Sequence, residues 1–560
     1  MGRLTKILLG LVLLFQSINS FAADVDVVLS NQSRNRAAQS ELMSSSFQSH
    51  LDEVSNSVRV KNNQSLLLIN GLMSYPARYA LIKKAKRSII LSTFSIYSHR
   101  DSSGGVVDSY SRKMVDLLVQ KKKAGVKVLV IYDGATSVLA QSQAAVDILR
   151  ANGIKVVKYN PVVGQDSELS LGLSLLPGAV RLLTNQNPIN NRWHEKTLIV
   201  DGTYLLSGGL NWGELYATGN AFSTYQYSPS GFYNQPLIKE LGVKAEKSWA
   251  PTQPDSWRDT DILVKGPVVT EAVRRLLFDF ALIDLLGEKG RSGYKYKNAS
   301  IEDLSEAYQR YMELYGDKEN IFFNPNYLKN ERANQVFSGS SMGTFRYMYQ
   351  RPYMDRRLDS RNEQIANYAK NNGLNYNEDN PSTYITNYYL NVINKAKKQI
   401  LWGCHSNRPT PEMLKALGDA AQRGVKIYIM GNSRASAKTL PDKGQLMYPS
   451  AYCHYRPLLR AGKGNIRIFE WQRELSINGV KRKSGAFHSK VFSVDGVLTS
   501  VGSYNLSKAS FKKHTEGTIV VADKDFSKEA ERMFSKDIRF TKEVKLIDLK
   551  DDTQGNCSNY

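Results

Sequence analysis

Cysteine, histidine and proline are scarce in this sequence of 560 residues, which contains 3 Cys, 7 His and 17 Pro. Three cysteines allow at most one internal disulfide, so the fold does not depend on a disulfide framework. Of the possible pairs, Cys404–Cys453 is preferred over a pair with Cys557. No CxxC pair and no clustered His and Cys residues at zinc-ligand spacing occur, which argues against a structural metal site. Little proline and 42% hydrophobic residues predict globular domains.

Long hydrophobic runs are also missing, except near the N-terminus. Arg3 and Lys6 precede an apolar stretch over residues 7–15, and Ser20-Phe21-Ala22 fits a cleavage site. Residues 1–22 are therefore predicted to be a signal peptide, and the mature chain to be exported to the periplasm or secreted. The apolar stretch is shorter than the ~20 residues that span a bilayer, and no cysteine lies nearby to accept a lipid, so we expect no transmembrane helix in the mature chain.

Acidic residues are too few to balance the basic ones. The chain has 75 Lys and Arg against 52 Asp and Glu, a formal charge of +23, and removing Arg3 and Lys6 with the signal peptide leaves +21. Such an excess indicates an anionic partner, either an acidic lipid surface or nucleic acid, and charge alone does not separate the two. A basic surface that only aids solubility is the alternative.

Two halves of the chain repeat one order of elements. KKAKRSIILSTFSIY (83–97) and NKAKKQILWGCHSNR (394–408) each read as a helix end followed by an apolar strand. MVDLLVQKKKAGVKVLVIYD (114–133) and MLKALGDAAQRGVKIYIMGN (413–432) read as helix, glycine turn and strand, and segments 148–160 and 458–471 add a further strand each. The order β-α-β-α-β, found twice, predicts two α/β sandwich lobes with largely buried sheets.

The same reading predicts the domain boundaries. The signal peptide (1–22) is followed by an N-terminal extension (23–65), a first lobe (66–282), an inter-lobe insertion (283–380), a second lobe (381–548) and a polar tail (549–560). Within the insertion, a helix is expected near 301–315. The extension and the tail are polar and are expected to be loosely held.

One polar motif occurs in both halves with identical spacing. WHEKTLIVDGTYLLSGGLN follows the pattern HxKx4Dx6GGxN, and FHSKVFSVDGVLTSVGSYN follows HxKx4Dx6GSxN. The first copy comprises His194, Lys196, Asp201, Gly208, Gly209 and Asn211, and the second comprises His488, Lys490, Asp495, Gly502, Ser503 and Asn505. A lone HxK pair is usually structural, but duplication after matching β-α-β segments makes coincidence a poor explanation.

Local geometry suggests how each motif is arranged. A histidine and a lysine two residues apart on a strand project from the same face. Asp-Gly between two apolar runs predicts a hairpin with a two-residue loop, and register counting then places His194 across from Gly209 and His488 across from Ser503. Because the two aspartates, Asp201 and Asp495, have the opposite strand parity, we expect them to be structural.

The paired motifs supply what cleavage of a phosphodiester requires. One imidazole can attack phosphorus and form a phosphohistidine, while the other protonates the leaving alcohol and later activates water or an alcohol. The two lysines and the two asparagines, Lys196, Lys490, Asn211 and Asn505, can hold the phosphate oxygens. This chemistry needs no metal and no cofactor.

These motifs resemble those of the phospholipase D superfamily, over most of 66–280 and 380–545. The segments 159–161, 208–216, 257–269 and 409–427 are similar to the cardiolipin synthase branch. The resemblance implies two lobes about a pseudo-twofold axis, an active site at the lobe interface and activity as a monomer. It also implies an acid against each histidine, for which Glu516 and Asp259 are candidates, with Asp259 serving the histidine of the opposite lobe. It favours His194 as nucleophile and His488 as acid and base, and near-symmetry leaves the reverse open.

Three functions remain at this point. The first is an exported phospholipase D or phosphatidyltransferase acting on phospholipid at a membrane surface, and the apolar segment 169–183 could then touch acyl chains or be ordinary core. The second is a secreted nuclease that acts on DNA or RNA, which the positive charge permits. The third is a non-catalytic binding protein, which the intact motifs disfavour. Headgroup, acceptor and target membrane are not defined by the sequence.

Overall fold

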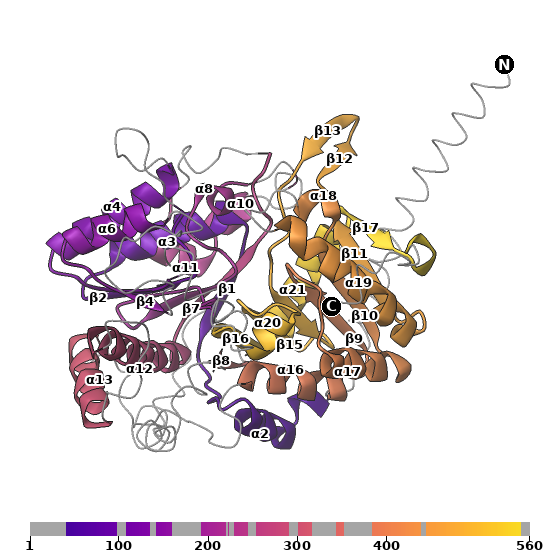
Figure 1. Ribbon diagram of the computed structural model, residues 1–560, viewed down its shortest axis with the longest axis horizontal. Coiled ribbons are helices and arrows are strands. Elements are labelled where there is room, and N and C mark those ends of the chain that lie inside the picture. The colour runs from indigo at the N-terminus through magenta and orange to yellow at the C-terminus, as the bar shows by residue number, and fades with distance from the viewer. Residues whose placement is uncertain are drawn as a thin grey trace, which may run out of the picture.

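A computed structural model describes residues 41–97, 108–134, 142–159, 192–219, 222, 229–244, 254–289, 301–315, 343–351, 383–437 and 444–549. Two lobes lie side by side, the first in indigo and magenta and the second in orange and yellow (Figure 1). The signal peptide, the segment 169–183 and the tail from 550 lie outside the described residues. Within the described part, none of the helices combines the length and apolar character needed to cross a bilayer.

The first lobe contains a seven-stranded sheet in the order β1-β7-β6-β5-β2-β3-β4. Strands β2, β3 and β4, which end at one edge of the sheet, are parallel, and the other neighbours are antiparallel. The strands are β1 (Gln64–Ile69), β2 (Ser88–Thr93), β3 (Lys127–Asp133), β4 (Lys155–Tyr159), β5 (Thr197–Val200), β6 (Tyr204–Gly208) and β7 (Thr260–Lys265). The helices are α3 (Gly71–Lys84), α4 (Ser109–Lys123), α6 (Gln143–Ala151), α8 (Glu214–Ala217), α10 (Pro229–Tyr233), α11 (Pro236–Leu241), α12 (Val268–Lys289) and α13 (Ile301–Tyr315).

The second lobe repeats this order in an eight-stranded sheet, β17-β11-β10-β9-β14-β15-β16-β8, with β17 as the additional edge strand. Its strands are β8 (Thr344–Gln350), β9 (Gln399–Gly403), β10 (Lys426–Asn432), β11 (Ile466–Trp471), β14 (Val491–Val494), β15 (Leu498–Gly502), β16 (Glu516–Ala522) and β17 (Thr541–Val544). A separate hairpin comprises β12 (Glu474–Ile477) and β13 (Val480–Lys483). The helices are α16 (Tyr384–Lys395), α17 (Pro411–Gln422), α18 (Arg434–Ala437), α19 (Gly444–Gly462), α20 (Lys508–Lys512) and α21 (Lys524–Ile538), with a 3-10 turn at Leu546–Asp548.

The helix ends show why the two halves fold alike. Asp108 caps α4 by accepting from Ser111 N, and Thr410 caps α17 by accepting from Met413 N. After each helix a glycine takes a positive φ, 87° at Gly125 and 94° at Gly424, before the next strand begins. The repeated AGVKV and RGVKI segments therefore specify the same helix-to-strand turn in both lobes.

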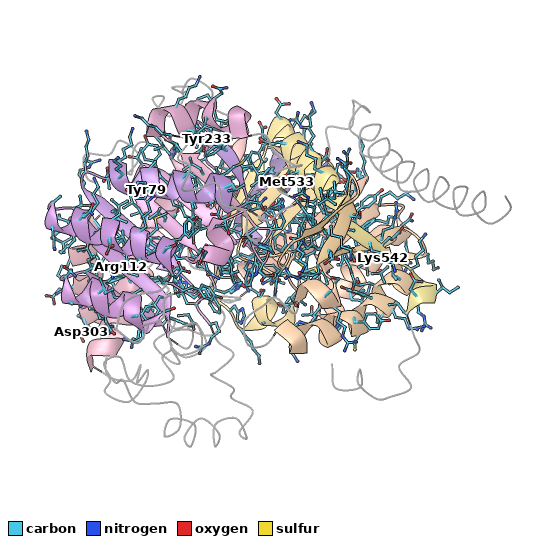
Figure 2. The ribbon with its side chains drawn as sticks, turned by 90° about the horizontal axis from the view of Figure 1, so that it is seen from above. Tyr79, Arg112, Tyr233, Asp303, Met533 and Lys542 are labelled. Carbon is cyan, nitrogen blue, oxygen red and sulfur yellow. The ribbon has the colours of Figure 1, made fainter. Side chains whose placement is uncertain are left out.

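A shared core joins the lobes. Helix α12 packs on the inner face of the first sheet, and its side chains lie in one cluster with Tyr347, Val501 and Ile519 of the second lobe. Met533 of α21 belongs to the same cluster, and Figure 2 places it between the two lobes. Strands β6 and β7 also contact β15 and β16 directly. The lobes thus meet along the strands that follow each motif, which predicts a fixed relation between the two half-sites.

Two segments pack more closely than the sequence predicts. Residues 41–63 are not loosely held: the 3-10 turn at Glu41–Met43 and helix α2 (Ser45–Val54) pack on the second lobe, and Leu42 and Leu51 are fully buried there. Strand β8, which falls inside the predicted insertion 283–380, pairs with β16 at the edge of the second sheet. The helix expected near 301–315 is α13. Hydrophobic periodicity in the sequence did not predict the packing of α2 and β8, because both elements are short and lie far along the chain from their partners.

The predicted Cys404–Cys453 disulfide is wrong. Cys404 is a free, buried thiol that donates to Asn407 Oδ1 at 2.6 Å and to Ser406 O at 3.2 Å. Cys453, on α19, is held in a disulfide. The apolar surroundings of Cys404 raise the pKa of its thiol to about 12, which keeps it protonated.

The motif hairpins exist, but their register differs from the prediction by one residue. Val200 pairs with Tyr204, and Val494 pairs with Leu498, so each loop holds three residues instead of two. Asp201 (φ 53°) and Asp495 (φ 52°) both take the left-handed conformation, as do the glycines that follow them. Continued at this register, His194 would not face Gly209, nor His488 Ser503. Neither histidine lies in its hairpin ladder.

The two motif aspartates bind each hairpin to the start of the strand beside it, β2 in the first lobe and β9 in the second. Asp201 accepts from the backbone N–H groups of residues 86, 87 and 88 at 2.8–2.9 Å, and Asp495 accepts from those of residues 397, 398 and 399 at 2.8–2.9 Å. We expect Asp201→Ala to lower the free energy of unfolding by ~1–3 kcal/mol, because three donors lose their acceptor, and to leave kcat per folded molecule nearly unchanged. Urea unfolding and active-site titration measure the two quantities.

Asp201→Asn is the matched control, since it keeps one acceptor oxygen and tolerates a positive φ. It should retain part of the stability that alanine loses. A large loss of kcat in Asp201→Ala with unchanged unfolding would instead make this aspartate part of the chemistry.

Candidate active site

Both histidines lie just before a hairpin, where their backbone pairs with the opposite lobe. His194 N donates to Thr515 O at 3.0 Å, and Thr515 N donates to Arg192 O at 2.9 Å. In the other half-site His488 N donates to Arg258 O at 2.7 Å, and Arg258 N donates to Ala486 O at 2.9 Å. Each histidine segment is thus one side of a short parallel bridge between the lobes.

These bridges bring a carboxylate from each lobe to the histidine of the other. Glu516 lies next to Thr515, and its two oxygens are 3.0 and 3.1 Å from His194 Nδ1. Asp259 lies next to Arg258, and its Oδ2 is 2.6 Å from His488 Nδ1. Both acids are fully buried, and the structure places both against the histidine of the opposite lobe. With Nδ1 occupied, each imidazole presents Nε2 for chemistry.

A buried arginine fixes the Asp259 side of the interface. Arg258 donates through Nε and Nη2 to the two oxygens of Asp537 on α21, at 2.9 and 2.6 Å. Its Nη1 donates to Thr260 Oγ1 at 2.9 Å. Because Arg258 and Asp537 are both buried, this two-pronged pair holds the residue before Asp259 against the second lobe.

The motif lysines are buried beside the histidines. Lys196 Nζ donates to His194 O at 2.5 Å, and Lys490 Nζ lies 2.7 Å from His488 Nδ1. Burial, together with the charge of Lys490, lowers the pKa of Lys196 to about 7. Burial likewise lowers the pKa of Lys490 to about 8. Because the charges of the two lysines act on each other, the two half-sites occupy one electrostatic environment.

The lysine pKa values predict an alkaline limit to activity. A lysine is cationic below its pKa, so both lysines lose their charge as pH rises through about 7 and 8. We expect kcat/KM to fall over this range, and kcat to fall at higher pH, because a bound phosphate anion stabilises the ammonium forms. Full pH-rate profiles measure this. The control Lys415→Ala, at a solvent-exposed lysine, should not move the profile, and a flat kcat/KM up to pH 9 would contradict the assignment.

The two motif asparagines are held by hydrogen bonds near the histidines. Asn211 Nδ2 donates to Tyr216 OH at 2.8 Å, and the ring of Tyr216 lies edge-on to His488, 5.5 Å between centroids. Asn505 N donates to Ser510 Oγ at 3.0 Å. Both side-chain Oδ1 atoms are shielded from solvent and lack a hydrogen-bond partner among the described residues. These two oxygens can accept hydrogen bonds from a ligand.

The small motif residues make room for the acids. A Cβ on Gly209 would lie 2.1 Å from Asp259 Oδ1, and one on Gly208 would lie 2.2 Å from an oxygen of Asp261. Gly502 likewise lies against the backbone of Gly517. In the second half Ser503 replaces the glycine and donates to Glu516. Gly208, Gly209 and Gly502 are therefore required by close packing rather than by conformational freedom.

Sequence reasoning missed several residues of the site. Asp133 Oδ2 accepts from Trp193 N and Asn432 Oδ1 accepts from Phe487 N, both at 2.7 Å, so a polar residue ending β3 or β10 holds the residue before each histidine. Aromatic and imidazole rings flank both histidines: Phe94 and His514 lie 5.1 and 5.3 Å from His194, and His405 and Trp257 lie 4.9 and 5.3 Å from His488. For Asp133 and Asn432 a signal was available, because each is the polar last residue of an equivalent apolar strand.

The two half-sites differ in their acids. Burial lowers the pKa of His194 to about 3, and His194 in turn holds the pKa of Glu516 well below its usual range, so this pair consists of a neutral imidazole and a carboxylate. Burial raises the pKa of Asp259 to about 6. Burial and the charges of Lys490 and Lys196 also hold the pKa of His488 well below its usual value, so both imidazoles are neutral in the empty site. The half-sites therefore differ in their acids, of which Asp259 is the stronger base and Glu516 the weaker.

One group of side chains has the composition of a metal site. Ligand atoms of His194, His514 and Glu516 lie within 4.8 Å of one another. However, the Glu516 carboxylate already accepts from His194, Ser503 and Ser510. These donors fit a carboxylate that orients a histidine, and we derive no step through a metal ion here.

Comparisons with known proteins agree with this geometry. The family model described as cardiolipin synthase, PLD-like domain, matches residues 79–221 and 389–538, together more than half of the chain and one segment in each lobe. The cardiolipin synthase of Geobacillus kaustophilus (strain HTA426) is 24% identical over 477 residues, which cover 85% of this chain and 66% of that protein. Cardiolipin synthase A of Pseudomonas putida is 21% identical over 490 residues, covering 88% of this chain and 71% of its own length.

A solved structure shares the architecture of both lobes. Phosphatidylserine synthase of Haemophilus influenzae Rd KW20 superposes with a TM-score of 0.54 at 10% identity, and the match covers 91% of this chain and 96% of that one. Two lobes that each bring a histidine and a lysine to a common interface define the class of phospholipase D-type enzymes. Within that superfamily, the chain belongs to the family of the cardiolipin synthase phospholipase D-like domain.

Proposed function

We propose that this chain transfers a phosphatidyl group from a phospholipid to an alcohol or to water, through a phosphohistidine intermediate. The observation that carries this proposal is the exchange of carboxylates between the lobes. Glu516 fixes the tautomer of His194, and Asp259 that of His488. Two imidazoles oriented in this way can act on opposite sides of one phosphorus atom.

In the first step His194 Nε2 attacks phosphorus and a phosphorus–nitrogen bond forms. The bond between phosphorus and the headgroup oxygen breaks, and the leaving alcohol takes its proton from His488. Asp259, whose pKa burial raises to about 6, is the more basic of the two acids and stabilises the protonated form of His488 that makes this donation.

In the second step the acceptor approaches from the side that the headgroup vacated. His488 now takes a proton from water or from an alcohol, and the acceptor oxygen attacks phosphorus. The phosphorus–nitrogen bond breaks and His194 returns to its neutral form, for which its low pKa is suited. One pair of histidines thus serves both hydrolysis and transfer, and the acceptor decides the product.

The lysines and asparagines stabilise the charge that develops on phosphate. Lys196 and Lys490 are buried cations next to the two histidines, and the side-chain N–H groups of the buried Asn211 and Asn505 are the further donors of the site. Fixed donors in a dry site stabilise a phosphorane-like transition state more than the ground state.

Phospholipid is favoured over nucleic acid as substrate because the relatives that match most of this chain are cardiolipin synthases. The charge of +23 favours an anionic surface and also permits the second candidate, a secreted nuclease. Both half-sites come from one chain, which supports action as a monomer. The N-terminal signal-like segment and the disulfide at Cys453 support export to an oxidising compartment, the periplasm or the medium.

The test is incubation with mixed phospholipid vesicles and labelled DNA, with and without glycerol, followed by mass spectrometry of the products. The wild type is expected to release headgroups, to form phosphatidic acid in water and to form a phosphatidylalcohol when glycerol is present. His194→Ala should give none of these products. Consumption of DNA alone, in a manner that falls steeply with salt, would replace the lipid proposal by the nuclease.

A further inference from the structure

The pseudo-twofold symmetry of the site is broken at one position beside each histidine. Ile89 on β2 and Ile400 on β9 occupy equivalent positions in the two sheets. Ile89 pairs with Val200, the last residue of β5, and Ile400 pairs with Val494, the last residue of β14. Counting on from these strands equates Phe94 with His405. Both rings pack against the histidine of their own lobe, Phe94 at 5.1 Å from His194 and His405 at 4.9 Å from His488.

An apolar ring therefore suffices to pack against a histidine at this position. Phe94 does so in the first half without any hydrogen-bonding atom. In the second half His405 is only half-buried, yet its Nε2 is shielded from solvent and has no hydrogen-bond partner among the described residues. A shielded polar atom without a partner is costly, so its presence indicates a ligand group that binds there.

The backbone of His405 is held in place relative to that of His488. Asn432 Nδ2 donates to His405 O at 3.1 Å and to Phe487 O at 2.7 Å, and Asn432 Oδ1 accepts from Phe487 N at 2.7 Å. One side chain thus fixes both the backbone of His405 and the residue before His488. On the other side of His405, Cys404 donates to Asn407 Oδ1 at 2.6 Å. A loop fixed at several points can orient a weak hydrogen bond productively.

We propose that His405 is a specificity-determining residue that binds the acceptor alcohol through a second hydroxyl of that alcohol, next to the hydroxyl that His488 activates. The inference rests on the proposed function and names the acceptor class, an alcohol with more than one hydroxyl. The ring of His405 lies beside His488, which exchanges protons with the leaving and the attacking oxygen, rather than beside the nucleophile His194.

The chemistry of His405 suits a hydroxyl. Burial and the neighbouring charges of His488 and Lys490 hold the pKa of His405 well below its usual value, so the ring is neutral. A neutral imidazole offers one donor and one acceptor, and a hydroxyl can use either. A polyol can place one hydroxyl at His488 and a second at His405, whereas the only oxygen of water is the one that attacks phosphorus, so this contact favours transfer to a polyol over hydrolysis.

The experiment compares two acceptors of equal carbon number, glycerol and 1-propanol, with phospholipid vesicles as donor. Three proteins are measured: the wild type, His405→Phe, which reproduces Phe94 of the first half, and His405→Gln, which keeps a donor and an acceptor. The readouts are the ratio of phosphatidylglycerol to phosphatidylpropanol per mole of acceptor, and the ratio of transfer to hydrolysis. A ratio between products of the same sample is insensitive to the fraction of folded enzyme.

We expect the wild type to prefer glycerol by roughly tenfold, the size of one well-placed hydrogen bond. His405→Phe should bring the two acceptors within about twofold and shift products toward phosphatidic acid, and His405→Gln should restore part of the preference. An unchanged preference in His405→Phe, or loss in both variants alike, overturns the role of His405 while leaving phosphatidyl transfer intact. If the wild type forms no phosphatidylalcohol with either acceptor, the proposed function itself fails.

Discussion

Alanine at His194 or at His488 is expected to lower phosphatidyl transfer by about 10⁴-fold or more, the effect of removing a member of a residue set that acts as a unit. The two losses should be similar with a natural phospholipid. In the proposed mechanism His194 forms the covalent bond of the intermediate, and His488 supplies the proton for its formation and takes one for its breakdown. Removing either therefore blocks a complete turnover.

The double variant His194→Ala/His488→Ala sharpens this test. Because neither histidine works without the other, the double loss should be close to a single loss and far from the product of two. His50→Ala is the matched control, since His50 lies on α2 and bonds to Asn391 at the surface. Headgroup release per folded enzyme measures all four proteins. Residual activity within tenfold of wild type in either single variant would contradict the shared site.

The second large effect is expected at the carboxylates that cross between the lobes. Glu516→Gln and Asp259→Asn should each lower kcat by about 10⁴-fold, the scale seen when an orienting carboxylate becomes an amide. Each substitution keeps the shape but replaces a carboxylate, which only accepts, with an amide whose N–H can donate to Nδ1 and so select the wrong tautomer. Both acids are fully buried, so water does not replace them. Asp255→Asn, at a half-exposed aspartate four residues before Asp259, is the control and should be neutral.

The two acids should respond differently to the leaving group. An aryl phosphodiester releases a stable phenolate and does not need the proton of the Asp259–His488 pair, so Asp259→Asn should recover much of its first-step rate on that substrate. Glu516→Gln should not recover, because its defect lies in the nucleophile. Recovery by Glu516→Gln and none by Asp259→Asn would reverse the assignment of nucleophile and acid.

Much of the fold could be predicted because its signals are local. The glycines Gly125 and Gly424, each after an amphipathic helix and before an apolar strand, marked equivalent turns, and the duplicated motif marked equivalent hairpins. The registers of those hairpins were off by one because Asp201 and Asp495 take the left-handed conformation in a three-residue loop. A dipeptide rule cannot tell this loop from the shorter one.

The partners of the histidines were harder to assign because they arise from contacts between lobes. Glu516 and Asp259 could be named as acids, but their cross-pairing depends on short bridges such as Trp193 with Thr515, which join segments remote in sequence. His405 occupies the position of Phe94 when the two repeats are aligned, so the replacement of phenylalanine by histidine was visible in the sequence. Its packing on His488 was not, because that depends on how the loop after β9 folds.

The central claim is that two imidazoles from different lobes act on one phosphorus atom with a division of labour. A rapid-mixing experiment with an aryl phosphodiester and His488→Ala tests it most directly. The aryl group leaves without an acid, but breakdown of the intermediate still needs His488, so we predict a burst of one phenolate per chain, slow turnover afterwards, and a phosphoryl group on the peptide that contains His194. His194→Ala should give no burst. A burst in His194→Ala, or a label recovered on the His488 peptide of the wild type, would contradict this account.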